Sequence, residues 1–325
     1  MSENLADTAI NSIADQSVQS TNNESETQQP ALSDVSPQDK PWDKHRAFAD
    51  RVQTLYAGTE FQPYSTRINF CSQLLEFGLQ PGEESLKLRL RNARFCRVPR
   101  CPICQWRRSL RWKAKAYQVL PKLIEQYPTY RWLFMTLTVK NVPVEQLRDE
   151  LKAMNKGFRR MTYRQKWPAV GWLRSTEVTR GRDGNAHPHF HCLLMVKPSF
   201  FTYGYIKQDE WRDTWRKCMK LDYNPVMDIR AIKQGDKPMQ LVPEIIKYVT
   251  KESDMVADRE WFLELTRQLH KMRLIATGGI LKEHLKELQQ EPEDLIGESD
   301  ESDAEDLMSL YFGWQHRESK YRLKD

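Results

Sequence analysis

The chain has 325 residues, 39% of them hydrophobic and 29% charged, which is enough for one large domain or two small ones. No apolar run approaches the ~18–20 residues needed to cross a bilayer. The first twenty residues hold acids and no basic stretch of the kind that begins a secretory signal. These features argue against a membrane-spanning or secreted protein, and we expect a cytoplasmic one.

The net charge of +6 is unevenly distributed. Residues 1–45 hold eight acids against two lysines, and residues 291–306 hold nine acids and no Lys or Arg. The remaining residues contain 48 Lys and Arg against 27 acids, a net charge of +21. A strongly positive charge on these remaining residues favours a polyanionic partner, most often nucleic acid. The alternative is that the charge serves solubility alone.

The first two segments differ sharply in composition. Residues 1–45 are acidic and polar, and they predict a disordered tail. Residues 60–128 form a basic, cysteine-rich segment, with eleven Lys and Arg and no acid between Lys87 and Lys115. We expect this segment to bind DNA phosphates through a helix that carries Arg107, Arg108 and Arg111.

Three cysteines in that segment have the spacing of metal ligands. Four residues separate Cys96 from Cys101, and two separate Cys101 from Cys104. Structural zinc takes four ligands, and Cys71 is the best upstream candidate. Redox activity is the alternative, but no thioredoxin-like strand precedes the close pair. We therefore predict a small zinc-binding segment.

Residues 129–256 alternate strand and helix patterns. Strands are predicted over 131–139, 169–179, 187–196 and 226–232. Helices are predicted over 144–164, 208–220 and 243–254. The Gly- and Asp-rich run 180–186 predicts a hairpin between the second and third strands. This order is typical of an α+β, ferredoxin-like (split βαβ) antiparallel sheet with helices on one face.

Three of the seven histidines lie at alternate positions of the third strand, in "HPHFHCLLMV". Residues two apart share one face of a strand, so His187, His189 and His191 would lie together. Glu177, on the other arm of the hairpin, is the obvious further ligand. Two imidazoles and a carboxylate leave coordination positions open for substrate. The alternative is a polar sheet face without a metal.

The last predicted helix of this region, "PEIIKYVTKESD", has a polar stripe. Glu244, Tyr248 and Lys251 lie at positions i, i+4 and i+7. A phenol has a pKa near 10, so it is a poor nucleophile unless nearby charge favours the phenolate. Residues 257–288 predict a helical extension, and residues 289–325 an acidic linker with a C-terminal tail.

Three segments, "FMTLTV" (134–139), "HPHFHCLLMV" (187–196) and "EIIKYVTKESD" (244–254), resemble in order the three motifs of HUH endonucleases. More narrowly, they resemble the single-tyrosine replication initiators of rolling-circle plasmids. The stretch "CRVPRCPICQWRR" is similar to the cysteine-rich segment that precedes the first motif in that group. The resemblance covers residues 65–255.

The resemblance implies a metal-dependent nicking and joining enzyme of HUH type. His189 and His191 match the histidine pair that binds Mg²⁺ or Mn²⁺, with His187 as an extra histidine. Tyr248 matches the nucleophile, Glu244 the acid that helps a water, and Lys251 the lysine three residues after the tyrosine. Implied partners are single-stranded or hairpin plasmid origin DNA, a host helicase and a host DNA polymerase.

Two other functions stay open on the sequence alone. A mobilisation relaxase or a single-tyrosine transposase would use the same chemistry, although the cysteine segment favours replication. A zinc-braced DNA-binding protein without catalysis would use the histidine strand only structurally. The sequence does not indicate an oligomeric state.

Overall fold

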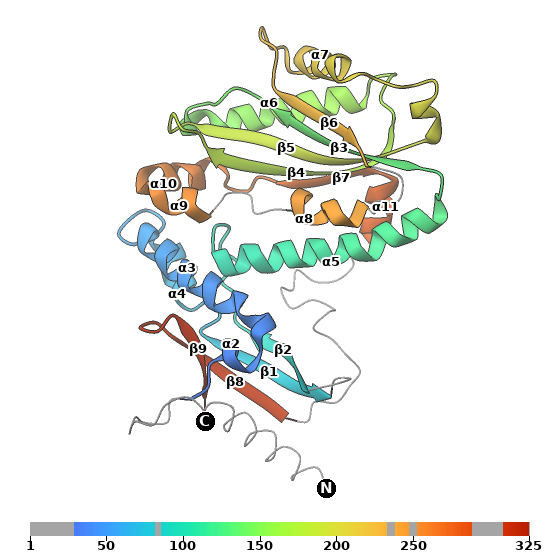
Figure 1. Cartoon of the computed structure of the whole chain (residues 1–325). Helices are drawn as coiled ribbons and strands as arrows, with labels where there is room; N and C mark the ends of the chain where they lie inside the picture. The colour runs from blue at the N-terminus through green and yellow to red at the C-terminus, as the bar shows by residue number, and fades with distance from the viewer. Residues whose placement is uncertain (1–28, 82–85, 233–237, 247–251, 288–307, 325) are drawn as a thin grey trace. The chain divides into compact units, whose positions relative to one another are not determined.

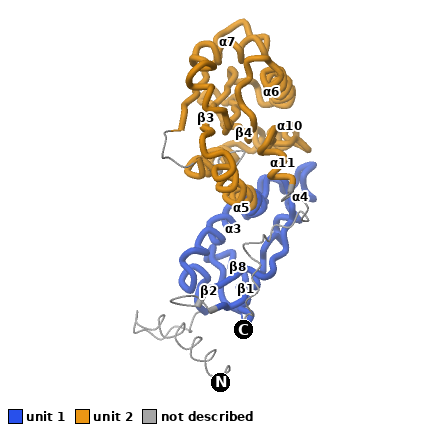
Figure 2. The backbone as a smooth tube through the Cα atoms, turned by 90° about the vertical axis from the view of Figure 1, so that its right-hand side faces the viewer, with its two compact units in different colours: residues 1–108, 294–325 blue, residues 109–293 orange. Residues whose placement is uncertain are grey.

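The computed structural model describes residues 29–81, 86–232, 238–246, 252–287 and 308–324. It divides into two compact units, which Figure 2 distinguishes by colour. Unit 1 contains residues 1–108 and 294–325, and unit 2 contains residues 109–293. No helix among the described residues is both long enough and apolar enough to cross a membrane.

Unit 2 is built on a five-stranded antiparallel sheet (Figure 1). Its strands are β3 (Arg131–Thr138), β4 (Ala169–Arg180), β5 (Ala186–Val196), β6 (Met227–Ala231) and β7 (Ile275–Gly279). Their spatial order is β6-β3-β5-β4-β7. The first four strands therefore have the split βαβ order, and β7 is added beside β4. The predicted α+β class and antiparallel sheet are confirmed.

Helices cover both faces of this sheet (Figure 1), so the prediction of helices on one face is wrong. One face packs against η2 (Val144–Gln146), α6 (Leu147–Thr162) and α7 (Gln208–Met219). The other face packs against α5 (Pro102–Gln126), α8 (Val242–Ile245) and α11 (Ile280–Glu287). The reason lies in β5, where the apolar run "CLLMV" contributes Leu194 to one core and Leu193 to the other. A strand that is apolar on both sides needs cover on both.

Several shorter elements complete unit 2. The described part of the helix predicted over 243–254 consists of α8 and α9 (Glu252–Ala257). The predicted helical extension contains α10 (Arg259–Gln268), then β7, then α11. The strand β7 has the sequence "IATGG". Its two glycines have no side chains, so the sequence does not show the alternation of apolar and polar residues that predicts a strand. The remaining short elements of unit 2 are the 3-10 helices η3 (Pro198–Phe201) and η4 (Pro238–Leu241).

Unit 1 is built on a four-stranded antiparallel sheet with the order β2-β1-β8-β9. Its strands are β1 (Leu74–Pro81), β2 (Leu86–Ala93), β8 (Met308–Gln315) and β9 (Lys320–Lys324). Its helices are α2 (Leu32–Val35), η1 (Pro37–Asp39), α3 (Pro41–Tyr56) and α4 (Gln62–Asn69), followed by the first turns of α5.

Two predicted tails are partly structured in unit 1, and the prediction is wrong there. Residues 32–45 form α2, η1 and the start of α3, and the chain end forms the hairpin of β8 and β9. Leu310, Phe312 and Trp314 of β8 are buried at alternate positions. This period of two is the strand pattern that the acidic residues before it obscured.

Candidate metal centres

The first candidate centre lies on the β4–β5 hairpin of unit 2. Glu177 of β4 is the direct cross-strand partner of His189, and His191 lies two residues further along β5. His191 and Leu193 share a strand face, and Leu193 belongs to the core beneath α5, α8 and α11. The predicted proximity of Glu177 to the two histidines is therefore present in the structure.

Three side-chain atoms converge in this centre. The Nε2 atoms of His189 and His191 each lie 2.9 Å from the same carboxylate oxygen, Oε2 of Glu177. Glu177 and His191 are buried, and the side chain of His189 is only 12% exposed. Burial opposes ionisation of Glu177, but the contacts with His189 and His191 outweigh it and hold the pKa of that carboxyl well below its usual range. The carboxylate is therefore ionised at neutral pH.

The orientation of the His189 ring is compatible with a bound cation. Nδ1 of His189 faces the backbone carbonyl of His187 at 3.3 Å, so Nδ1 carries the proton in the neutral ring. With a second proton on Nε2, the ring donates to the carboxylate oxygen of Glu177 and favours its ionised form; without that proton, the lone pair of Nε2 points toward the same oxygen. Lone pairs that converge in this way need a proton or a metal between them. Together, Glu177, His189 and His191 could hold a divalent ion and leave coordination positions open.

His187 lies beside this group but outside it. Its ring centroid is 5.4 Å from that of His189, and its Nδ1 is 2.7 Å from Oδ1 of Asn141. Asn141 in turn donates to the carboxylate of Asp183. Burial, and then the neighbouring His189, lower the pKa of His187. Asn141 and Asp183 are not part of any recognisable sequence motif. Their role in orienting His187 is therefore visible only in the structure.

The second candidate centre is a buried cluster of the four predicted cysteines in unit 1. Their sulfur atoms all lie within 4.8 Å of one another. The separations from Cys71 to Cys104 and from Cys71 to Cys101 are 3.7 Å, and that from Cys96 to Cys104 is 3.6 Å. Zinc–sulfur bonds of about 2.3 Å in a tetrahedron give sulfur–sulfur edges of roughly 3.8 Å. The cluster therefore fits one zinc ion.

Backbone and burial effects act on the same sulfurs. The backbone N–H of Arg97 donates to the sulfur of Cys104 at 3.3 Å, and that of Cys96 to the sulfur of Cys71 at 3.5 Å. Burial raises the pKa of the Cys101 thiol, and hydrogen bonds from the other three thiols lower the pKa of Cys104. Four buried thiolates require a cation to balance them.

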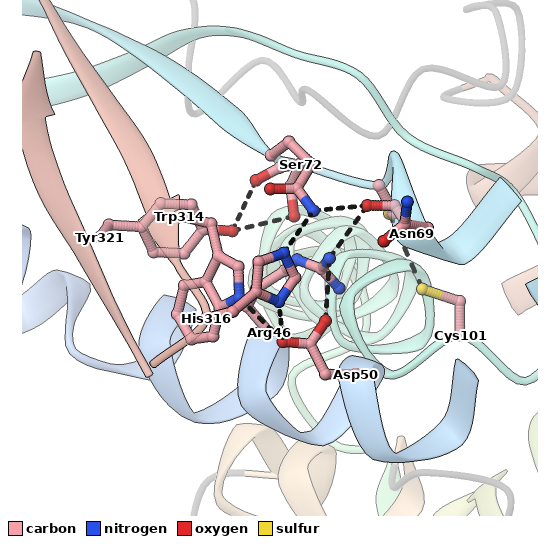
Figure 3. A network of polar contacts seen from close by, with 10 residues as sticks. Arg46, Asp50, Asn69, Ser72, Cys101, Trp314, His316 and Tyr321 are labelled. Carbon is pink, nitrogen blue, oxygen red and sulfur yellow. Dashed lines mark hydrogen bonds and ion pairs between the residues drawn. The ribbon is translucent and has the colours of Figure 1, made fainter. Parts of the chain in front are cut away.

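A polar network connects the cysteine cluster to the C-terminal hairpin (Figure 3). The hydroxyl of Tyr321 donates to the backbone carbonyl of Ser72, next to Cys71, at 2.7 Å. The buried Arg46 forms a 3.0 Å ion pair with Asp50. Asp50 also accepts from the indole of Trp314 at 2.8 Å. Side chains of β8 and β9 therefore support the loop that carries the first cysteine.

The arginines expected to contact DNA also have partners within the protein. The guanidinium of Arg107 lies 5.5 Å from the ring centroid of Trp42 and 5.9 Å from that of Trp106. The guanidinium of Arg108 donates to the backbone carbonyl of Arg97. Arg111 follows one turn later on α5. DNA contacts by these arginines stay a prediction.

The tyrosine motif lies only partly within the described residues. Glu244 is in α8, whose Val242 and Ile245 are buried against the sheet face that carries the Glu177 centre. Tyr248 and Lys251 lie in residues 247–251, outside the described residues.

The chain matches the family described as "Replication protein" over residues 87–322. It is 34% identical to "Protein rep" of Bacillus amyloliquefaciens, over 86% of this chain and 89% of the relative. Two other proteins named "Protein rep" are similar. The protein from Streptococcus pneumoniae is 36% identical over 73% of this chain and 77% of its own. The protein from Lentilactobacillus hilgardii is 32% identical over 89% of this chain and 98% of its own length.

No solved structure matches the chain. The family match extends over both units, from β2 to β9, and includes both candidate metal centres apart from Cys71. The chain therefore belongs to the replication protein family, as its sequence motifs indicate.

Proposed function

We propose that this chain initiates rolling-circle plasmid replication by nicking one strand of the double-strand origin and later rejoining it. The proposal rests above all on the convergence of Glu177, His189 and His191 in a replication protein. When bound there, Mg²⁺ or Mn²⁺ would act as a Lewis acid on the scissile phosphate. The three side chains would fix the ion's position and leave room for a phosphate oxygen.

Tyr248 is the proposed nucleophile. Its phenolic oxygen forms a bond to phosphorus, and the bond from phosphorus to the 3′ oxygen breaks. The products are a 5′-phosphotyrosine link and a free 3′-OH. The phosphodiester energy is kept in the protein–DNA bond, so rejoining needs no nucleotide hydrolysis. The 3′-OH would prime a host polymerase, and a host helicase would unwind the duplex.

The described chain on either side of Tyr248 supports this assignment. Ile246, two residues before it, is buried on the sheet face that carries the metal centre. After the tyrosine, Asp254 of α9 accepts a hydrogen bond from the backbone N–H of Arg180, at 3.0 Å. Arg180 is three residues from Glu177 on β4. Both described flanks of the tyrosine motif therefore contact the sheet that carries Glu177, and this supports the proposal that Tyr248 is the nucleophile.

Glu244 and Lys251 complete the proposed chemistry. Glu244 lies on α8, on the same sheet face, and would accept a proton from the water that releases the finished strand. Lys251 would favour the phenolate through its charge. The cysteine cluster would hold structural zinc, and the basic surface of unit 1 would contact origin phosphates.

A covalent-adduct assay tests the proposal. Single-stranded oligonucleotides that tile the origin of the parent plasmid are labelled at the 3′ end and incubated with the protein and Mn²⁺. We expect the label to migrate with the protein on a denaturing gel, because the 5′ phosphate of the downstream fragment becomes linked to Tyr248. Copies labelled at the 5′ end should yield a shorter, protein-free product.

Variants distinguish the tyrosine from other nucleophiles. Tyr248→Phe should form no adduct, whereas Tyr163→Phe, at an exposed tyrosine after α6, should form as much as the wild type. Equal adduct from Tyr248→Phe would overturn the mechanism. No adduct from the wild type on any oligonucleotide would favour the non-catalytic DNA-binding protein. Cleavage only of a transfer origin would favour a relaxase.

A further inference from the structure

The outer face of the unit 1 sheet has an exposed hollow, lined by both apolar and polar side chains, that the proposed mechanism does not use. On β1, Leu75 and Phe77 are buried in the core, whereas Leu74 on the opposite face is 50% exposed. Phe70 and Tyr311 are also exposed, by 50% and 41%. They line a hollow of about 360 Å³ together with Gln73, Leu74, Glu76, Asn92, Ala93 and Arg94.

Polar side chains of the hollow form a row across the sheet, which Lys324 of β9 extends beyond the hollow. Glu76 of β1 is paired with Asn92 of β2 on one side and with Tyr311 of β8 on the other. Tyr311 is paired in turn with Lys324 of β9. Directly opposed residues of antiparallel strands have Cβ atoms about 4.5–5.5 Å apart. An amide, a carboxylate, a phenol and an ammonium group therefore follow one another across one face.

The surroundings of the hollow are cationic. The guanidinium of Arg94 lies 5.6 Å from the ring centroid of Phe70. Arg67 and Arg97, both exposed, lie next to Cys96, since Arg67 donates to the backbone carbonyl of Cys96 and Arg97 follows it in the chain. These cations lie beside the cysteine cluster, because Phe70 precedes Cys71 and Arg94 is two residues from Cys96. Phosphates are their natural partners.

Flat rings, edge-reading polar groups and a cationic rim are what proteins use to bind unpaired bases. Aromatic rings stack on the base, amides and carboxylates contact its edge, and cations hold the backbone. Glu76 makes the hollow itself unsuitable for a bare phosphate. A carboxylate accepts from an exocyclic amino group, as in contacts to N4 of cytosine, and thymine lacks that group.

We propose that this hollow binds an unpaired, amino-bearing nucleobase of origin DNA, with Phe70 and Tyr311 as stacking rings and Glu76 as the edge contact. The inference rests on the proposed function for its DNA partner. It adds a base-reading site to unit 1, separate from the nicking centre of unit 2. Sequence preference would then reside partly in a unit that performs no chemistry.

Binding measured without added Mg²⁺ or Mn²⁺ tests the inference independently of nicking. The full chain is titrated at pH 7.5 with fluorescent (dC)₁₂, (dA)₁₂ and (dT)₁₂, and anisotropy is recorded. We expect (dC)₁₂ and (dA)₁₂ to bind at least about 5-fold more tightly than (dT)₁₂. Tyr311→Leu and Phe70→Leu should each weaken (dC)₁₂ binding by roughly 5- to 100-fold, because a base–ring stack is lost.

Glu76→Gln should bring the ratio of (dC)₁₂ to (dT)₁₂ affinity toward one. Tyr163→Leu, an exposed tyrosine of unit 2, is the matched control and should bind as the wild type does. Zinc content and melting temperature establish that each variant is folded. Unchanged binding by folded Tyr311→Leu and Phe70→Leu would overturn the inference. If these variants lose binding while the wild type forms no covalent adduct, the proposed nicking fails and the base-reading site stands.

Discussion

The two candidate metal centres are built in different ways. The centre in unit 2 comes from one hairpin, where the register of β4 and β5 alone brings Glu177 to the two histidines. The centre in unit 1 comes from two separate stretches, with Cys71 ahead of β1 and the other three cysteines after β2. It is supported by Tyr321, which lies near the other end of the chain. A local centre depends on strand register, whereas the distributed centre depends on the folding of its whole unit.

The largest effect should come from losing a cysteine. Cys101→Ser should remove the bound zinc and most of the stability of unit 1, because zinc contributes about 10–16 kcal/mol in small zinc domains. Metal analysis and thermal unfolding measure both effects. Cys218→Ser, at a buried cysteine of unit 2, should leave the zinc content unchanged. Full zinc occupancy in Cys101→Ser would show that the cluster is not a zinc site.

Replacing the Glu177 carboxylate of the hairpin centre should have the next largest effect. Glu177→Gln should weaken Mn²⁺ binding by at least about 100-fold, because it removes a ligand and its charge. Isothermal titration measures the affinity, and the zinc content of unit 1 should not change. His187→Gln should weaken Mn²⁺ binding by less than about 10-fold, since His187 lies outside the converging atoms. Equal losses in the two variants would make His187 a third imidazole ligand.

The smallest effect should come from breaking the hydrogen bond between the C-terminal hairpin and the loop that carries Cys71. Tyr321→Phe should lower the free energy of unfolding of unit 1 by about 1–3 kcal/mol, because the carbonyl of Ser72 loses its buried donor. Burial raises the pKa of Tyr321, so the folded state favours the neutral phenol. This stability is complete below the unfolded pKa of about 10 and is lost as the pH rises above it. Urea unfolding at pH 7 and pH 11 should show a smaller difference for Tyr321→Phe than for the wild type.

Much of unit 2 could be predicted because its patterns are local. Short apolar, β-branched and aromatic runs located β3, β4, β5 and β6, and helical spacing located α6 and α7. The hairpin turn implied that Glu177 and the histidines would meet. The short strand β7 was missed because its glycines have no alternating pattern. Orientation of His187 by Asn141 depends on a contact between residues 46 positions apart, which no spacing rule reveals.

Unit 1 was predicted less well because its contacts join the two ends of the chain. The four cysteines have a recognisable spacing, but the pairing of Leu75 with Phe312 has no local signal. The acidic residues before β8 predicted a tail, and the buried alternation within β8 contradicts it. The exposed ring of Tyr311 likewise gains a role only when β8 lies beside β1.

The division of unit 1 between the chain ends has a consequence for synthesis on the ribosome. Residues 109–293 emerge before β8 and β9, so unit 2 can fold while the sheet of unit 1 still lacks two of its four strands. A product terminated early would contain the proposed nicking centre without the strands that support the cysteine cluster and line the proposed base-reading hollow. Completion of the last strand therefore determines when the chain has both units at once.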